Sequence, residues 1–461
     1  MTNTVRAEAG SVTCHTGPVT NQAAERAPIS GTTAGEISES VRNLVGTGRL
    51  RPGDAVPPIR ELATELGVHR NTVAAAYRML VAAGVAETRG RRGTVVASLP
   101  RLDGEAAANT ELVDLSSGNP DPALLPDIAA ALAKLDYHPQ MYGSLAVEPR
   151  LAAWARTTFT PEVDAPFEVS VTHGAVDAVE RLLVAHLTRG DLVALEDPCF
   201  YASSGTVRLN GFRAAPVPVD AEGLDPRTLR STLDAGARAV VITPRVHSPT
   251  GVSLTAERAR EIRSVLAKYP HVLVIEDDHF SAISRHPYHR ATPDAAGRWA
   301  LVRSVAKFLG PDLRVAVVAS DQDTSERLGT RLRPGATWVS RLLQQLVVEL
   351  LESDAAAEQF DRARRAYAER VDTLRDELAA EGVETPFPTD GFNVWVPTPR
   401  GSAAPVAALR EAGWSVRDGG MFLAPASTAS PGIRITAARL ARPQAREFAQ
   451  RLGAVLRSTS G

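Results

Sequence analysis

Lysine is scarce in this chain of 461 residues, and one lysine stands where an amine could do covalent chemistry. Of the 51 lysine and arginine residues, only Lys134, Lys268 and Lys307 are lysine. Arginine stays protonated, whereas a desolvated lysine can lose its proton and act as a nucleophile. Lys134 and Lys268 lie in amphipathic helical segments, where arginine would serve as well. Lys307 follows the apolar stretch WALVRSVA, so we expect it at the end of a buried strand, partly desolvated, as a Schiff-base lysine must be.

Other residues supply what a Schiff-base cofactor of the pyridoxal phosphate (PLP) type needs, namely an acid for the ring nitrogen and donors for the phosphate. Asp277 ends the apolar run VLVIED. Its carboxylate is therefore expected at the carboxyl edge of a sheet, where open α/β sheets bind ligands. Ser304 and Arg314 flank Lys307 in sequence, and their hydroxyl and guanidinium groups are both phosphate ligands.

A turn and an aromatic side chain complete the set. The sequence THGA (residues 172–175) precedes a helical pattern, so the backbone N–H groups at Gly174 and Ala175 would meet the same phosphate. Phe200, after EDPC, would stack on the cofactor ring. Taken alone, each residue has a structural explanation, such as Asp277 capping a turn or Arg314 pairing with a surface acid. The ordered set favours a PLP site.

A sheet must position these residues. Short apolar runs at residues 191–198, 237–244, 271–278 and 314–320 alternate with amphipathic helices, which is typical of a mostly parallel sheet buried on both faces. After about residue 355 the sequence predicts one long arginine-rich helix and a smaller α/β segment. We therefore predict an α/β domain over residues 113–461, with a small C-terminal subdomain at about 360–461.

The segment over residues 31–97 has a different pattern, with three predicted helices. Their apolar faces are predicted from helical spacing, and the second and third helices join at a tight turn, as in a helix-turn-helix. The third helix is expected to expose Arg70, Asn71, Thr72 and Arg78 among alanines, which lets a helix approach base edges. The residues expected on the three apolar faces are Ile37, Val41, Leu44 and Val45; Ile59, Leu62, Ala63 and Leu66; and Val73, Tyr77, Leu80 and Val81.

The sequence ETRGRRGTVVA (residues 87–97) predicts a β-hairpin wing with Arg89, Arg91 and Arg92 at its tip. Residues 31–97 hold nine arginines against six acids, a local charge of +3 within a chain of −2. Such arginines suit phosphate contacts, so double-stranded DNA is the expected partner. A small helical domain with a solvated basic loop is the alternative explanation.

The rest of the composition excludes several classes. Residues 1–30 are small and polar and are predicted to be a disordered tail, and residues 98–112 a linker. The two cysteines, Cys14 and Cys199, form no disulfide framework, which fits a reducing cytoplasm. We expect neither a signal peptide nor a membrane span, because no apolar run approaches about 18 residues. No metal site is expected.

The N-terminal pattern resembles a known family of winged helices. The sequence GRLRPGDAVPPIRELATELGVHRNTVAAAYRMLVAAG, followed by GRRGTVV, is similar to the GntR-type winged helix over nearly all of residues 35–97. The resemblance implies that Arg60, Arg70, Asn71, Thr72 and the wing around Gly93 face DNA. Many relatives have serine at the positions of Pro58 and His69, so the base preference of those relatives cannot be assigned to this chain. His69 stays among the residues expected to face DNA.

The remaining chain, from about residue 114 to 440, resembles fold-type I PLP-dependent aminotransferases. The motifs GNPDPALLP, MYGS, THGA, EDPCF, HSPTG, EDDHF, SVAK and GIRI occur in that family's order. A GntR-type winged helix fused to this fold resembles the MocR-type transcriptional regulators. The EDDHF and HSPTG forms are similar to the PtsJ-like branch, which is associated with control of vitamin B6 salvage.

This resemblance implies a role for each matching residue. Lys307 would bind PLP as the internal aldimine, Asp277 would pair with the pyridinium nitrogen, and Phe200 would stack on the ring. Ser304, Arg314 and the turn at Gly174 and Ala175 would hold the phosphate. Tyr142 would reach the phosphate of the neighbouring subunit, which implies a head-to-tail homodimer. Arg434 would bind the carboxylate of a substrate or effector.

Three places depart from the aminotransferase pattern, and at one of them Val315 and Ala316 follow Arg314 where glycine often occurs. Ser248 replaces the asparagine that hydrogen-bonds the phenolic oxygen of PLP, and His279 replaces a common tyrosine. Weaker hydrogen bonding to that oxygen puts efficient transamination in doubt.

Three functions follow, in order of preference. The first is a transcription regulator that senses PLP, alone or with an amine or amino-acid effector, and shifts a dimer between DNA-binding geometries. The second is an active aminotransferase with an accessory DNA-binding domain. The third is a regulator whose large domain only dimerises, for which Lys307→Ala would change nothing.

Overall fold

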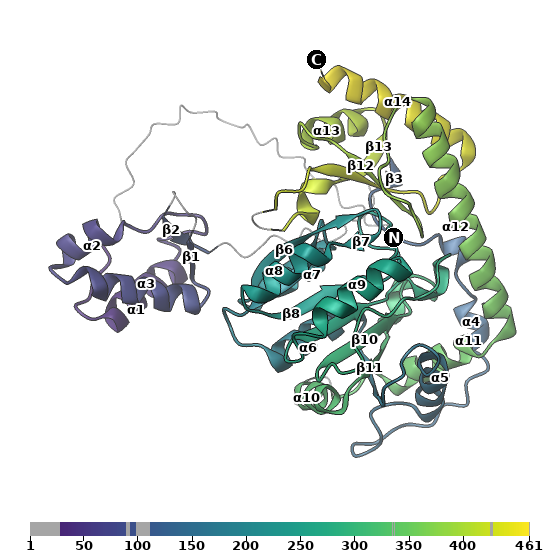
Figure 1. Cartoon of the computed structure of the whole chain (residues 1–461), viewed down its shortest axis with the longest axis horizontal. Helices are drawn as coiled ribbons and strands as arrows, with labels where there is room; N and C mark the ends of the chain where they lie inside the picture. Colours follow the sequence, from purple (N-terminus) through teal and green to yellow (C-terminus); the bar gives the residue numbers. More distant parts are fainter. Residues whose placement is uncertain are drawn as a thin grey trace, which may run out of the picture. The chain divides into compact units, whose positions relative to one another are not determined.

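The computed structural model forms two compact units, residues 1–98 and 99–461, which are described separately (Figure 1). The expected wing-tip residues Arg89, Arg91 and Arg92, most of the expected tail and residues 98–110 of the expected linker lie outside the described residues. The structure describes residues 28–88, 93–97, 111–333, 335, 337–424 and 427–460.

The first unit is a winged helix, as the sequence predicted. Helix α1 begins with a capping box, in which the Thr33 side chain accepts from the backbone of Glu36 and the Glu36 carboxylate accepts from the backbone of Thr33. Helix α2 ends at Gly67, whose φ of +66° turns the chain towards α3. The elements are α1 Ala34–Gly46, α2 Ile59–Leu66, α3 Arg70–Ala82, and the antiparallel strands β1 Ala86–Thr88 and β2 Thr94–Val96.

The core of this unit corrects three expectations. Ile29 is buried among the three helices, so the predicted tail boundary at residue 30 falls inside the packed domain. Ile59 and Val81 are 36% and 41% exposed, although both were expected on buried faces. Ile59 is the first residue of α2, and Val81 lies one position beyond the buried stripe of α3, about 100° further around the helix.

The second unit is α/β, as predicted, and is built on an eight-stranded sheet of order β4-β11-β10-β9-β8-β5-β6-β7. Neighbours from β10 to β6 are parallel, whereas β11, β4 and β7 pair antiparallel. The strands are β4 Glu168–Thr172, β5 Leu192–Asp197, β6 Arg213–Asp220, β7 Gly223–Leu224, β8 Ala237–Ile242, β9 Leu273–Asp277, β10 Trp299–Ser304 and β11 Ala316–Ser320.

Helices cover this sheet on both sides (Figure 1). Alternate residues of one strand pack into two different clusters: Leu273 and Ile275 join one, and Val274 joins the other. The continuous apolar runs in the sequence therefore correspond to strands buried on both faces. The helices and 3-10 turns are η2 Pro122–Leu124, α4 Ile128–Leu132, α5 Pro149–Phe159, α6 Ala175–His186, α7 Tyr201–Leu209, α8 Pro226–Asp234, α9 Ala256–Leu266, η3 Ser281–Ile283, η4 Pro311–Leu313, α10 Gln322–Leu332 and α11 Arg341–Leu351.

The same unit contains a second, smaller sheet of four strands in the order β12-β14-β13-β3. Its edge strand β3 comes from the beginning of the domain, which the predicted boundary near residue 360 did not include. Helix α12 packs Tyr367 into the large core and Leu374 into the small core. The elements are β3 Val113–Leu115, α12 Asp354–Ala380, β12 Asn393–Pro397, α13 Ala403–Glu411, β13 Trp414–Asp418, η5 Gly419–Phe422, β14 Gly432–Thr436 and α14 Arg442–Ser460.

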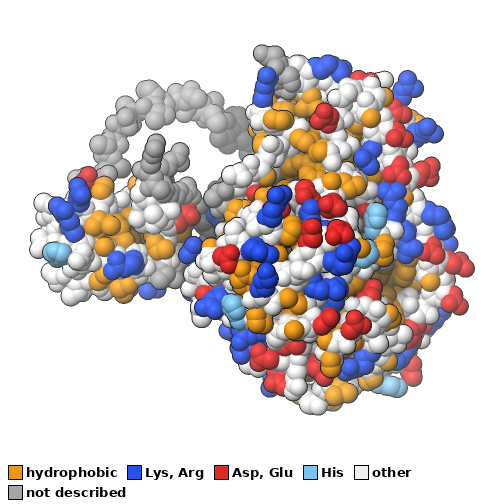
Figure 2. Space-filling model, in the orientation of Figure 1, with side chains coloured by type: hydrophobic (Ala, Val, Ile, Leu, Met, Phe, Trp, Pro, Cys, Tyr) orange, Lys and Arg blue, Asp and Glu red, His pale blue; other side chains and the backbone are white. Residues whose placement is uncertain are grey.

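The surface of the larger unit mixes charges of both signs on the face that Figure 2 shows. That face therefore carries no extended patch of a single sign. Among the described residues, no helix combines the length and apolar character that crossing a membrane requires.

Candidate cofactor site and DNA-binding surface

A cavity of about 270 Å³ brings together residues from nine segments of the larger unit. It lies where β9 and β10 end, at the carboxyl edge of the parallel strands. Of the residues predicted from sequence, Ala175, Phe200, Ser248, Asp277, His279, Ser304, Lys307, Arg314 and Arg434 line it. The lining also includes Gly118, Asn119, Val176, Tyr201, Ala202, Phe280, Ala306, Pro311 and Asn393.

Lys307 follows β10 and extends its amine into this cavity. Its Nζ donates to the backbone oxygen of Gly118 at 2.8 Å and lies 5.5 Å from the ring centre of Phe280 and 6.0 Å from that of Phe392. The amine is thus held between a carbonyl and two aromatic rings, the partly desolvated setting that Schiff-base chemistry requires.

Asp277 is the last residue of β9, and its side chain is 8% exposed. Its Oδ1 is buried without a hydrogen-bond partner among the described residues, although the Nδ1 of His279 lies 3.2 Å away. A buried carboxylate oxygen without a donor is costly unless a ligand supplies one. A protonated pyridine nitrogen is such a donor, so the site fits the ring of PLP.

The other end of the cavity is built to hold an anion. Helix α6 begins at Ala175 after Gly174, so its first N–H groups face outward with the positive end of the helix dipole. The Arg314 guanidinium lies against Gly174 and donates to the backbone oxygen of His173. Ser304 contributes a hydroxyl to the same cavity. These groups suit the phosphate of PLP.

A side chain at Gly174 would strain the backbone and crowd the Arg314 guanidinium. Its φ of +91° with ψ of 171° is essentially restricted to glycine, and a Cβ would lie 3.1 Å from the Arg314 Nη2. We expect Gly174→Ala to weaken PLP binding about tenfold or more, since strain of about 1–3 kcal/mol and a displaced guanidinium both act on the phosphate end. Equilibrium titration with PLP measures this.

Gly329→Ala is the matched control for this substitution. Gly329 lies within α10, and a Cβ added there would have no heavy atom within 4 Å, so alanine should leave PLP affinity unchanged. Equal affinities of the two variants for PLP would contradict the phosphate role of the Gly174 turn.

Phe200, Ser248 and His279 lie around the region where a cofactor ring would rest. The ring of His279 is 6.3 Å from that of Phe200, at an interplanar angle of 32°. Ser248 is buried and precedes the cis Ser248–Pro249 peptide bond. The hydroxyl and the imidazole thus border the cavity where aminotransferases have asparagine and tyrosine.

Arg434 lies on β14 and is 1% exposed. It donates to the backbone oxygen of Ser116 and its guanidinium carbon lies 5.1 Å from the ring centre of Phe422. The neighbouring Asn393 was missed by the sequence prediction. Its Oδ1 accepts from the Thr436 hydroxyl at 3.0 Å, so the amide group is oriented on the cavity wall beside Arg434.

Other missed residues had a partial signal. Gly118 and Asn119 belong to the GNPDP motif, and Tyr201 follows the predicted Phe200. No sequence pattern pointed to Asn393, because only the pairing of β12 with β14 brings it to the cavity.

Tyr142 does not reach the cavity of its own chain. It is 89% exposed and touches Trp338, at 5.4 Å between ring centres. Met141 and Leu145 beside it are also largely exposed, at 72% and 71%. Three exposed apolar side chains thus lie close together in the sequence here.

A buried acid and imidazole lie next to Asp277. The Oε1 of Glu196 accepts from the backbone of Thr243 at 3.0 Å, and its Oε2 lies 3.4 Å from the His247 Nε2. Burial raises the pKa of Glu196 to about 8 and lowers the pKa of His247 to about 3. Burial thus favours the uncharged form of both groups.

This pair gives a testable pH dependence. The folded-state pKa of Glu196 lies above its ordinary value, so its contribution to stability is complete below about pH 4.5 and is lost as pH rises through about 8. We expect Glu196→Gln to remove that decline, so that its melting temperature relative to wild type rises between about pH 5 and 8. The exposed Glu326→Gln is the control; a parallel shift there would refute the assignment.

The expected DNA-binding residues lie on the first unit. Arg60, Arg70, Asn71 and Arg78 are exposed, and Thr72 is half-buried. His69 is the N-cap of α3, and its Nδ1 accepts from the backbone of Asn71 at 3.2 Å. The first turn of α3 is thus capped by the side chain of its own N-cap residue. At the wing, Gly93 adopts a φ of +74° before β2.

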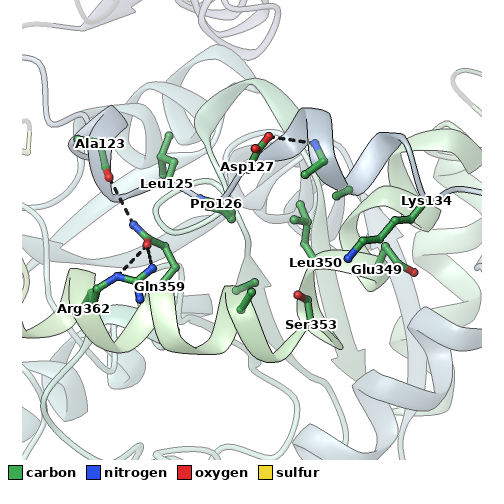
Figure 3. Close-up of a pocket in the computed structure, with 14 residues that line it drawn as sticks. Ala123, Leu125, Pro126, Asp127, Lys134, Glu349, Leu350, Ser353, Gln359 and Arg362 are labelled. Carbon is green, nitrogen blue, oxygen red and sulfur yellow. Dashed lines mark hydrogen bonds between the residues drawn. The ribbon is translucent and has the colours of Figure 1, made fainter.

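Lys134 lies in a different cavity, of about 330 Å³, between α4, α11 and α12 (Figure 3). Its side chain runs beside Glu349, while Gln359 bridges Ala123 and Arg362 at the other side of the cavity. Lys134 therefore lines a cavity that includes neither Asp277 nor Arg314. The described residues contain no cluster of three His, Cys, Asp or Glu that could hold a metal ion.

Comparison with family models matches both units. Residues 33–96 match bacterial regulatory proteins of the gntR family, and residues 110–452 match aminotransferase class I and II. The latter domain typically binds PLP.

Two curated proteins and one solved structure illustrate the likeness. The chain is 46% identical to the vitamin B6 salvage pathway transcriptional repressor PtsJ of Salmonella typhimurium, covering 89% of this chain and 96% of that protein. It is 28% identical to the HTH-type pyridoxine biosynthesis transcriptional regulator PdxR of Corynebacterium glutamicum, covering 74% and 78%. The α-aminoadipate aminotransferase LysN of Thermus thermophilus, complexed with N-(5'-phosphopyridoxyl)-L-leucine, matches with a TM-score of 0.67 at 24% identity, over 76% of this chain and 93% of that chain. At that identity the likeness to LysN shows the fold alone.

Proposed function

Because the chain belongs to the MocR-type transcription regulators, in which a GntR-type winged helix is fused to an aminotransferase-like domain, we propose that it regulates transcription in response to PLP. One observation carries this proposal: Lys307, Asp277, Ser304 and Arg314 line a single cavity in a chain that also has a DNA-binding helix. PLP would supply an electrophilic aldehyde that the Lys307 amine can capture covalently as a Schiff base.

Each residue that the sequence predicted for this site has a role in this proposal. Lys307 captures the aldehyde, Asp277 accepts from the ring nitrogen, and Phe200 covers a ring face. The phosphate is held by Ser304, Arg314 and the α6 start at Gly174 and Ala175. Ser248 and His279 border the phenolic oxygen, and Arg434 is available for the carboxylate of an amine or amino-acid effector.

The proposed assembly is a head-to-tail homodimer in the cytoplasm. The exposed Tyr142 and its apolar neighbours support it, since a second copy would cover them and bring Tyr142 to the neighbour's phosphate. Operator DNA would contact the α3 face and the wing, with two half-sites read by the two winged helices.

The proposed regulated genes are those of vitamin B6 supply. The relative at 46% identity is a repressor of the vitamin B6 salvage pathway, and a second relative regulates pyridoxine biosynthesis. A regulator that binds the end product of such a pathway can adjust its supply.

A gel-shift titration with DNA from upstream of this protein's own gene, with and without PLP, tests the proposal. We expect the DNA affinity to differ between the two states, since a ligand shifts an equilibrium only through differential affinity. Identical affinities would remove PLP as the effector.

A second candidate is an active aminotransferase, favoured by Arg434 and Asn393 on the wall that Lys307 shares. Single-turnover spectra with a panel of amino acids discriminate it. Conversion of bound PLP to pyridoxamine phosphate at a useful rate would promote this function; Ser248 in place of asparagine argues against it.

A further inference from the structure

Residues 116–119, here called the strap, border the candidate cofactor cavity at Gly118 and Asn119 and bond to two of the cations that line it. The Gly118 carbonyl accepts from the Lys307 Nζ at 2.8 Å, and the Ser116 carbonyl accepts from Arg434. These two groups, which the proposed function assigns to ligand binding, are thus engaged by backbone of the same chain. A ligand that takes the Lys307 amine must compete with the strap.

The two ends of the strap are held differently. At the Ser116 end, the Asp114 carboxylate accepts from the backbone of Ser116 and Ser117 at 2.9 and 3.1 Å, and Arg417 also donates to the Ser116 carbonyl at 3.1 Å. At the Gly118 end, the N–H donates to the Thr436 hydroxyl at 3.2 Å. Within the strap, the Asn119 N–H also donates to the Ser117 hydroxyl at 3.3 Å. Thr436 and Lys307 join the Gly118 end to the rest of the domain, so this end is the more easily released.

The strap lies on the covalent route between the units. It directly follows β3, the edge strand that pairs parallel with β13, and the chain enters β3 from the segment that leads back to the winged helix. A change in the strap therefore acts on the residues through which the DNA-binding unit is attached.

Capture of an aldehyde removes the donor that holds the Gly118 end. A carbon–nitrogen double bond forms at the Lys307 Nζ, and the aldehyde oxygen leaves as water with two of the three ammonium hydrogens. The nitrogen then has a single N–H in place of three. Its bond to the Gly118 carbonyl is accordingly weakened or lost, whereas the bonds at Ser116 are untouched.

We propose that the strap is the element that reports occupancy of Lys307 to the DNA-binding unit. This inference rests on the proposed function, since it requires that PLP bind Lys307. PLP releases the Gly118 end of the strap and leaves the Ser116 end in place. The Ser116 end stays bonded to Asp114 of β3, so the released strap acts on β3, from which the chain leads back to the winged helix.

Residue-resolved hydrogen exchange of the full-length protein, with and without PLP, tests this. We expect exchange at Gly118 and Asn119 to accelerate about fivefold or more with PLP, as the loss of one hydrogen bond allows. The amides of Ser116 and Ser117, held by Asp114, should stay unchanged and serve as the internal control.

Thr436→Val provides a second test, because it removes the hydrogen bond to the Gly118 N–H and leaves Lys307 in place; it also removes the donor to the Asn393 Oδ1. This variant should exchange rapidly at Gly118 without PLP and bind DNA with the affinity of the PLP-bound wild type. Thr398→Val is the matched control, since the Thr398 Oγ1 is buried without a hydrogen-bond partner among the described residues. It should behave as wild type in both measurements.

The outcomes separate the two proposals. If PLP changes the DNA affinity while exchange at Gly118 and Asn119 stays constant, the strap is overturned and the proposed function stands. If PLP changes neither quantity, the proposed function falls and the strap with it. A Thr436→Val protein with wild-type exchange and DNA affinity also overturns the strap.

Discussion

Replacing Lys307 with alanine is expected to abolish covalent attachment of PLP completely. The amine lies on the cavity wall with Asp277 and Arg314, and neither of the other lysines borders that cavity. Alanine has no group that can form a bond to the aldehyde, so only non-covalent binding remains. Borohydride reduction followed by peptide mass spectrometry measures the result: wild type should be labelled at Lys307 alone, and the variant nowhere.

Lys134→Ala and Lys268→Ala are the matched controls, and both should keep the full label. The same three proteins also test the hypothesis in which the large domain only dimerises. That hypothesis predicts that Lys307→Ala binds DNA as wild type does, with or without PLP. A PLP response that persists unchanged in Lys307→Ala would contradict the role given to this lysine.

Arg70→Ala is expected to weaken operator binding strongly without unfolding the winged helix. Arg70 is exposed at the start of α3, where its side chain has no role in the core formed by Val73, Tyr77 and Leu80. Loss of a bidentate arginine contact costs about 1–3 kcal/mol, which is a decrease in affinity of about 5- to 150-fold. Fluorescence anisotropy with operator DNA measures it.

Salt titration of the same variant shows which contact Arg70 makes. If Arg70 contacts a phosphate, the variant should lose affinity equally for all DNA sequences, and the slope of log affinity against log salt concentration should fall in magnitude by about one. If Arg70 contacts a base, loss of the side chain should instead reduce the preference for the operator sequence. Arg42→Ala on α1, whose side chain is 55% exposed, is the control and should bind as wild type. Equal losses in both variants would indicate a general effect of charge.

The sequence predicted which residues share the candidate cofactor cavity wherever their proximity follows from their order along the chain. Asp277 and Lys307 come at the ends of adjacent parallel strands, β9 and β10, and such strands end at one edge of a sheet. Placing each residue at the end of an apolar run was therefore enough to predict their proximity.

Residues that depend on distant pairing could not be found in this way. Asn393 reaches the cavity only because β12 pairs with β14, and Gly118 reaches Lys307 only because β3 joins the small sheet as its edge. Neither residue lies in a local pattern that predicts contact with a distant segment; Gly118 and Lys307 are 189 residues apart. The packing of Ile29 was hidden for a similar reason, since one isoleucine in a polar segment gives no periodic signal.

Helix α12 has a consequence for how the larger unit loses its structure. The helix has 27 residues; Ala363 and Tyr367 pack into the large core, and Val371, Leu374 and Leu378 into the small core. When either core unfolds, one half of this continuous helix loses its apolar contacts, and the other half is destabilised as a result. The two subdomains are therefore energetically coupled and should unfold by heat in one cooperative transition, with no stable species that keeps only one of them.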